Sequence, residues 1–413
     1  MRVVLGVGGG IAAYKAAEVL RRLTESGHDV RVVPTRSSLR FVGAATWEAL
    51  SGHPVTDDVF TDVPDVTHVR LGREADLVLV VPATADLMAR MAHGRADDLL
   101  TAALLTARCP VVVVPAMHTE MWEHPATRDN VATLRARGTV VVEPAVGRLA
   151  GSDSGKGRLP EPGQIADLAQ AMLRRGTGGV GGAVCDLAGR AVLVTAGGTQ
   201  EPLDPVRFIG NRSSGRMGYA LATMAVARGA EVTVLAANVD LPDPAGARVV
   251  PVRTTAELHQ QLLAEWAGAD AVVMAAAPAD YRPADPAPAK VKKSVQGPQM
   301  SVDLTQTDDI LVDLVRRRGA AQLPVLVGFA AETGDDGLAT VVPQARDKLA
   351  RKGCDLLVVN DVSAGRVFGR DDTEAVVLDR DGSEQPVPYG TKIELADVIW
   401  DRVAKRLTDR VPR

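Results

Sequence analysis

The 413-residue chain is poor in the features that mark secreted, zinc-binding or membrane proteins. It has three cysteines, Cys109, Cys185 and Cys354, which are too few and too scattered for a disulfide framework or a zinc site. Apolar runs such as residues 77–81 and 111–114 have the length of strands, far short of the roughly 20 residues of a membrane span. The first residues do not resemble a signal peptide. We therefore expect a cytoplasmic protein with no membrane partner.

The charge balance argues against a nucleic-acid-binding protein, and the composition favours an α/β fold. The chain has 47 Lys and Arg against 51 Asp and Glu, a net charge of -4, so it lacks the basic surface expected of a nucleic-acid partner. Aromatic residues make up only 3%, whereas apolar residues make up 46%. Small apolar residues suit close-packed α/β layers with buried parallel strands. The length exceeds that of one ordinary core and favours two or three domains.

Strand-like and helix-like segments alternate along both halves of the chain, which predicts two Rossmann-like open parallel sheets. Between the halves, residues 176–183 contain five glycines in eight positions, which indicates a flexible linker. The predicted domains are residues 1–175 and 190–413, joined by a Gly-rich linker over 176–189. Ligands of such sheets bind beyond the carboxyl ends of the strands.

The first strand ends at a glycine loop, residues 6–11, which lacks the third glycine of the dinucleotide fingerprint because Ile11 stands there. After the second strand, where an NAD site carries an acidic residue, the chain has Arg36, Ser37 and Ser38. Hydroxyl groups and an arginine suit a terminal phosphate. This pattern favours a mononucleotide such as FMN, while Arg36 leaves open the 2'-phosphate of NADP, and a turn without a ligand also fits.

Several further motifs follow predicted strands in this half of the chain. They are GGGIAAYK at 8–15, THV at 67–69, PATAD at 82–86, DDLLT at 97–101 and PAM at 115–117. With these motifs the first half resembles the flavin-dependent cysteine decarboxylases, a family whose fold is flavodoxin-like. The resemblance implies that His68 is catalytic, acting beside the flavin, and that FMN is the cofactor. We also count His118 among the catalytic candidates. It further implies FMN contacts from Gly9, Gly10, Ser37, Ser38, Ala83, Thr84 and Met117.

Two positions depart from the family pattern. His118 stands where the family usually has an asparagine that contacts the substrate carboxylate, and a histidine can also donate a hydrogen bond there. Gly151 stands where a cysteine usually protonates the reaction intermediate. Cys109, at the start of an apolar strand, is expected to be a buried small hydrophobe. The candidates for the missing donor are Lys156, Asp153, His118 and water, and a decarboxylase half with impaired activity is an alternative.

The second half opens with a strand, a long polar loop and a helix over residues 191–225. Loops between a strand and a helix usually need only a few residues, so the stretch 197–218 indicates a functional loop. Its glycines precede a helix N-terminus, the setting in which backbone N–H groups receive phosphate.

Three later clusters carry chemistry suited to a nucleotide. Residues 275–281 place small side chains and Asp280 after a buried strand, and Asp280 offers a hard oxygen for Mg²⁺. Residues 290–293 alternate like a charged edge strand around Lys290. Lys348 and Lys352 are four residues apart and therefore share one helix face. Converging cations would stabilise the charge that grows on a leaving pyrophosphate, although such pairs are also common on solvated surfaces.

With these clusters the second half resembles the phosphopantothenate-cysteine ligases, and the whole chain resembles the bacterial bifunctional enzymes that join both activities. The resemblance implies that Asn211 handles an acyl-cytidylate intermediate and that Lys290 is catalytic. It implies contacts with CTP from Ala275, Ala276, Ala277, Asp280, Lys290, Thr307, Asp308, Asp309, Ile310, Phe329, Lys348 and Lys352, with Asp280 also as the metal ligand.

The resulting hypothesis is a pair of consecutive reactions. CTP activates the carboxylate of 4'-phosphopantothenate, the amine of L-cysteine attacks, and FMN-dependent decarboxylation then gives 4'-phosphopantetheine. The resemblance implies a homo-oligomer with trimeric decarboxylase units and dimeric ligase units. The alternatives are an NADP-type oxidoreductase with tandem Rossmann domains and a nucleotide-sensing module without turnover.

Overall fold

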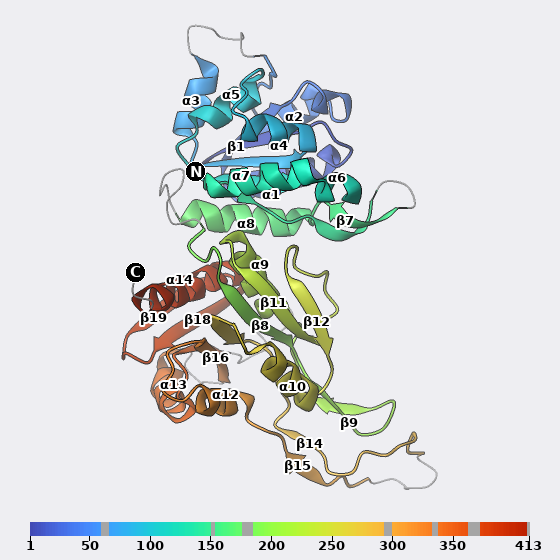
Figure 1. The fold of residues 1–413 in the computed structure, drawn as a ribbon, viewed down its shortest axis with the longest axis vertical. Coiled ribbons are helices and arrows are strands. Elements are labelled where there is room, and N and C mark those ends of the chain that lie inside the picture. The colour runs from blue at the N-terminus through green and yellow to red at the C-terminus, as the bar shows by residue number, and fades with distance from the viewer. Residues whose placement is uncertain are drawn as a thin grey trace. The chain divides into compact units, whose positions relative to one another are not determined.

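The computed structural model describes residues 1–58, 66–149, 153–175, 185–292, 300–332, 338–361 and 372–410. The chain divides into two compact units, one of Met1–Ala188 with Val226–Gly229 and the other of Gly189–Ala225 with Ala230–Arg413. Gly151 and most of the predicted linker, residues 176–184, lie outside the described residues. Each unit has its own large sheet (Figure 1). Each also has its own cluster of buried apolar side chains.

The first unit is built on a five-stranded parallel sheet in the order β2-β1-β3-β4-β5. The strands are β1 (Arg2–Val7), β2 (Asp29–Pro34), β3 (Leu77–Ala83), β4 (Val111–Pro115) and β5 (Val140–Val141). Every residue of β3 and β4 is buried, as expected for strands that are covered on both faces. This order is that of flavodoxin-like folds, so the predicted doubly wound sheet is confirmed.

Helices cover both faces of this sheet (Figure 1). On one face α1 (Ala13–Glu25) packs against α8 (Pro162–Arg174), and on the other lie α3 (Thr67–Glu74), α4 (Ala85–Ala92), α5 (Leu99–Thr106) and α7 (Pro125–Ala136). Further elements are a 3-10 turn η1 (Ser38–Arg40), α2 (Ala44–Ser51), α6 (Thr119–Glu123) and an antiparallel hairpin of β6 (Ala145–Arg148) and β7 (Ser154–Arg158). Helix α5 begins at Leu99 because Asp98 and Thr101 form a capping box.

The second unit contains an eight-stranded sheet in the order β12-β11-β8-β13-β16-β17-β18-β19. The strands are β8 (Ala191–Gly197), β11 (Glu231–Ala237), β12 (Arg248–Val252), β13 (Ala271–Met274), β16 (Val325–Glu332), β17 (Leu356–Asp361), β18 (Asp372–Asp379) and β19 (Glu384–Thr391). The predicted open parallel sheet is confirmed through β17, and the last two strands make the sheet mixed, because β18 is antiparallel to β17 and β19 is antiparallel to β18. A short turn joins them, with Gly382 at a positive φ of 90°, and only an antiparallel pair can be joined so briefly.

Helices α10 (Thr255–Glu265), α12 (Ile310–Arg318) and α13 (Leu338–Lys352) cover one face of this sheet, and α9 (Arg216–Ala227) and α14 (Lys392–Arg410) pack together on the other. Two small hairpins complete the unit: β9 (Gln200–Pro202) with β10 (Phe208–Gly210), and β14 (Tyr281–Pro283) with β15 (Leu304–Gln306). The predicted charged edge strand is not found at Lys290–Lys292, which form a loop. None of the helices in the described ranges combines the length and apolar character needed to cross a membrane.

Candidate active sites

In the first unit, the glycine loop lies where the ends of β1, β2 and β3 meet. The N–H of Gly8 donates to the carbonyl of Pro82 at 2.9 Å, and the N–H of Thr35 donates to that of Val7 at 2.9 Å. A Cβ on Gly9 would lie 2.4 Å from the Cβ of Ser37, so only glycine fits between these loops. A Cβ on Gly10 would meet nothing closer than 3.6 Å. Gly9 is therefore required by packing, and Gly10 is not.

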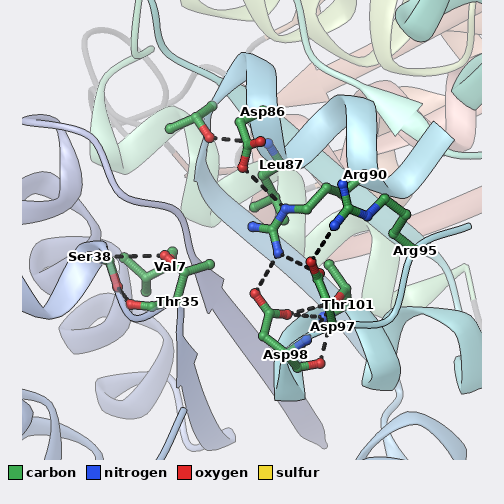
Figure 2. A network of polar contacts seen from close by, with 11 residues as sticks. Val7, Thr35, Ser38, Asp86, Leu87, Arg90, Arg95, Asp97, Asp98 and Thr101 are labelled. Atoms are coloured by element: carbon green, nitrogen blue, oxygen red, sulfur yellow. Dashed lines mark hydrogen bonds and ion pairs between the residues drawn. The ribbon is translucent and has the colours of Figure 1, made fainter. Parts of the chain in front are cut away.

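Polar groups from the next loops lie at the same edge. Thr84 caps α4, and its hydroxyl accepts from the N–H of Leu87 at 3.2 Å. Ser38 is fully buried, and its hydroxyl donates to the carbonyl of Thr35 at 2.7 Å (Figure 2). Ser37 is exposed. The structure therefore presents the Ser37 hydroxyl to solvent and uses that of Ser38 within the turn.

The motif at residues 97–101 serves the local structure. The guanidinium of Arg90 donates to Asp86 at 3.1 Å, Asp97 at 3.1 Å and Asp98 at 2.7 Å (Figure 2). Burial alone would lower the pKa of Arg90, but the carboxylates of Asp98 and Asp97 raise it. This cluster joins α4, the helix that Thr84 caps, to the start of α5 and holds the loop between them.

His68 lies apart from the glycine loop within one chain. It is in the first turn of α3, and its carbonyl accepts from the hydroxyl of Thr106 at 2.9 Å. Thr106 ends α5, which leads to the amino end of β4, whereas the glycine loop is at the carboxyl ends of the strands. The Nδ1 atom of His68 is buried and has no hydrogen-bond partner among the described residues. One chain thus gathers the predicted FMN contacts without the predicted catalytic imidazole.

The second predicted histidine lies beside the β6–β7 hairpin. The N–H of Met117 donates to the carbonyl of Gly157 at 3.0 Å, which fixes the turn that carries His118. The Nδ1 atom of His118 lies 3.8 Å from a carboxylate oxygen of Asp153. These contacts place His118 and Asp153 together at the hairpin.

Lys156, another candidate proton donor of this half, is engaged in an ion pair, and Cys109 is buried. Lys156 pairs with Glu143 at 2.6 Å, and although burial would raise the pKa of Glu143, Lys156 and Arg135 lower it. The prediction that Cys109 is a buried hydrophobe is confirmed, because it is 0% exposed and burial raises the pKa of its thiol to about 11. Lys156 is thus held in an ion pair, and Cys109 lies in the core.

In the second unit a cavity of about 530 Å³ gathers most of the predicted ligase residues. It is lined by Asn211, Ala275, Ala276, Ala277, Asp280, Thr307, Asp308, Asp309, Ile310, Phe329, Lys348 and Lys352. These residues come from segments up to 141 positions apart in sequence, which the sheet edge and α13 bring together. Lys290, although described, does not line the cavity.

Hydrogen bonds fix the small-residue loop of this cavity. The N–H groups of Ala276 and Ala279 donate to the hydroxyls of Thr195 and Thr199 at 2.9 and 2.8 Å. The side-chain amide of Asn211 donates to the carbonyl of Pro278 at 2.7 Å. The loop is thus rigid, and its small side chains leave backbone accessible to a flat ligand such as a base.

Charged groups surround the other side of the cavity. Asp309 caps α12 by accepting from the N–H of Val312 at 3.2 Å, and it also pairs with Lys352. Lys348 and Lys352 both lie on α13 and line the cavity, as the spacing predicts. Four further cationic residues line the cavity and are absent from the predicted site: Arg212, Arg216, Arg351 and the buried Lys392. Lys392 begins α14 without any motif that would have indicated it.

The cavity is compatible with a metal ion held mainly by a substrate. Asp280 lines it with an exposed carboxylate. Within the described segments, no group of three or more His, Cys, Asp or Glu side chains is arranged to hold a metal ion. Mg²⁺ commonly binds through one or two carboxylates together with substrate phosphates, and a single carboxylate fits that mode.

Comparison with known proteins covers both units. Residues 1–174 match the Flavoprotein family, and residues 187–407 match the DNA/pantothenate metabolism flavoprotein C-terminal domain. The chain is 59% identical to the coenzyme A biosynthesis bifunctional protein CoaBC of Mycobacterium tuberculosis, over 97% of this chain and 96% of that protein. It is 40% identical to the CoaBC protein of Bacillus subtilis over 97% and 96%.

Solved structures match each half of the chain. A crystal structure of the C-terminal domain of a CoaBC protein is 32% identical, covers 54% of this chain and 98% of that chain, and has a TM-score of 0.45. The FMN-dependent cysteine decarboxylase SpaF is 32% identical, covers 42% of this chain and 96% of that chain, and has a TM-score of 0.37.

Proposed function

The chain belongs to the family of bifunctional coenzyme A biosynthesis proteins CoaBC, with phosphopantothenoylcysteine decarboxylase and phosphopantothenate-cysteine ligase activities, and we propose that its units divide these reactions between an FMN site and a CTP site. The proposed division is residues 1–175 for the decarboxylase and 190–413 for the ligase, with 176–189 as the linker. The observation that carries the CTP site is the cavity that gathers the predicted ligase residues.

In the ligase reaction, the carboxylate of 4'-phosphopantothenate attacks the α-phosphorus of CTP, and pyrophosphate leaves. Lys348 and Lys352 on α13 would stabilise the charge on the triphosphate. Asp280 would hold Mg²⁺, which would supply further neutralisation of that charge. The loop at Ala275–Ala277, with Phe329, would receive the cytosine. The amine of L-cysteine then attacks the acyl carbon and CMP leaves, with Asn211 holding the acyl-cytidylate. Lys290 would contact the phosphates from its loop.

The residues of the first unit fit FMN, because Gly9 packs directly on the turn that carries Ser37, and Ser37 and Thr84 lie at the same edge of the sheet. Ser38, Ala83, Gly10 and Met117 complete the proposed contacts. When bound, the flavin supplies oxidation of the substrate thiol, which makes the neighbouring carboxylate labile. His118, beside Asp153, would hold the substrate carboxylate, and His68 would transfer a proton. Because His68 and Gly9 lie apart within one copy of the chain, we propose that a second copy supplies the histidine of each flavin site. The proposed assembly has trimeric decarboxylase units and dimeric ligase units.

Mass spectrometry of the products tests this proposal. The purified protein is incubated with phosphopantothenate, cysteine, CTP and Mg²⁺, and replacement of CTP by ATP is the matched control. We expect 4'-phosphopantetheine, which would mean that a group other than a cysteine at position 151 delivers the proton. Accumulated phosphopantothenoylcysteine would overturn the proposed decarboxylase site, and turnover with ATP equal to that with CTP would overturn the proposed CTP site.

A further inference from the structure

The loop that carries Lys290 is docked on the loop before β10 through one carboxylate. Asp204 is 1% exposed, although it lies in a connecting loop. Its Oδ1 atom accepts from the N–H groups of Val206 and Arg207, both at 2.8 Å. Its Oδ2 atom accepts from Arg207 at 2.6 and 3.0 Å and from the N–H of Val291 at 3.2 Å. One side of the carboxylate thus builds the local turn, and the other reaches a residue 87 positions away.

Val291 is held at both of its backbone groups. Its N–H donates to Asp204, and its carbonyl accepts from the guanidinium of Arg207 at 2.9 Å. The N–H of Ala287 also donates to the carbonyl of Leu203 at 3.0 Å, so the segment is fixed on both sides of Lys290. Lys290 itself is exposed and does not line the cavity among the described residues. Its position therefore depends on this backbone attachment.

We propose that Asp204 is a positioning residue for the ligase reaction, which docks the Val291 backbone so that Lys290 can reach the phosphates of CTP. This inference rests on the proposed role of Lys290. The hydrogen bonds of Arg207 keep the pKa of Asp204 well below its ordinary value, so the carboxylate accepts from all its donors throughout the physiological pH range. Asp204 acts through Lys290 and touches no substrate itself.

The variant Asp204→Asn separates the two sides of the carboxylate. Its amide oxygen can keep the bonds from Val206 and Arg207 that form the turn. Its amide nitrogen would then face the N–H of Val291 and the Arg207 guanidinium, and donors do not bond to donors. Arg207→Lys is a milder second variant, because one ammonium cannot reproduce a planar fork that bonds Asp204 and Val291 together.

The experiment measures pyrophosphate release from CTP and phosphopantothenate in the full-length protein. For Asp204→Asn we expect kcat to fall roughly 10- to 100-fold, since misplacement of a reacting group costs about this much, with the KM for CTP within about twofold. Arg207→Lys should show a smaller fall in kcat. Hydrogen exchange should quicken at residues 284–292 and stay unchanged in the β-sheet.

The matched control is Asp355→Asn, which removes an equally buried carboxylate that pairs with Arg318 in the same unit. It should lower the unfolding temperature but preserve kcat. The inference would be overturned if kcat were unchanged in Asp204→Asn. It would also be overturned if both variants lost kcat equally and hydrogen exchange quickened across the whole unit. The variant Lys290→Gln tests the premise separately from the role of Asp204. Full activity in that variant would overturn the proposed role of Lys290 itself.

Discussion

The two units differ in how completely one chain assembles a site. In the second unit, residues from Asn211 to Lys392 line a single cavity. In the first, Gly9, Ser37 and Thr84 share one edge of the sheet, while His68 lies in the first turn of α3, where its carbonyl contacts Thr106 at the end of α5. In both units the sequence motifs point to candidate site residues by their chemical type. They do not show whether those residues come together within one copy of the chain. Variants that act in one unit only can test this difference.

The largest expected effect is that of His68→Asn on decarboxylation. Loss of a proton-transferring imidazole should slow carbon dioxide release from supplied phosphopantothenoylcysteine by roughly 10²- to 10⁴-fold, with the ligase rate unchanged. Oligomers reassembled from His68→Asn and Gly9→Ala chains should recover part of the activity, because some sites would then combine an intact loop with an intact histidine. No recovery in mixed oligomers would argue for a site completed within one chain.

Lys290→Gln should have the next largest effect, confined to the second unit. Removal of one preorganised cation that stabilises the leaving pyrophosphate should lower kcat for pyrophosphate release by roughly 10²- to 10³-fold. Decarboxylation of supplied phosphopantothenoylcysteine is the internal control and should not change. Equal losses in both assays would show that the two units do not work independently.

Gly9→Ala and Gly10→Ala form a matched pair for the flavin site. The first places a Cβ 2.4 Å from that of Ser37, and the second meets nothing closer than 3.6 Å. Flavin absorbance per chain in the purified protein should fall several-fold, roughly three- to tenfold, in Gly9→Ala, since about 1 kcal/mol of lost affinity or more follows from such a shift. Gly10→Ala should retain its flavin, and equal flavin content in both variants would contradict the packing argument.

The smallest expected effect is that of Asp313→Asn on the unfolding temperature and on its dependence on pH. Hydrogen bonds from Arg317 keep the pKa of Asp313 below its ordinary value despite burial, with help from His259 and Arg316. The stabilisation is therefore present above a pH of about 4 and is lost as the pH falls further. Asp313→Asn should unfold roughly 2–4 °C lower at pH 7. The gap to the parent protein should narrow at pH 3, and thermal scans at both values of pH measure it; a gap that widens in acid would contradict the assignment.

The sequence predicted the parallel strands of both sheets well, because buried parallel strands leave continuous apolar runs such as those of β3 and β4. It did not predict the direction of the last strands of the second sheet, where Val376–Leu378 look equally apolar in a parallel or an antiparallel strand. The strand expected around Lys290 is a loop, since alternating charges alone do not supply a pairing partner.

Prediction of the sites had a similar limit. The spacing of Lys348 and Lys352 indicated one helix face, and both line the cavity. The cavity contribution of Lys392 follows from how α14 begins beside β18, a tertiary relation that no local pattern encodes. Ser37 and Ser38 look alike in sequence, yet only the turn geometry decides which hydroxyl is buried. The roles of these residues remain predictions for the variants above.

The cavity of the second unit draws its walls from distant parts of the chain, from the loop before α9 to the first turn of α14. A nucleotide bound there can contact only the folded unit, so its binding energy adds to the free energy of unfolding. Nucleotide at 100 times its dissociation constant would add about 2.7 kcal/mol. The lifetime of the ligase half against proteolysis would then rise and fall with the cell's supply of CTP.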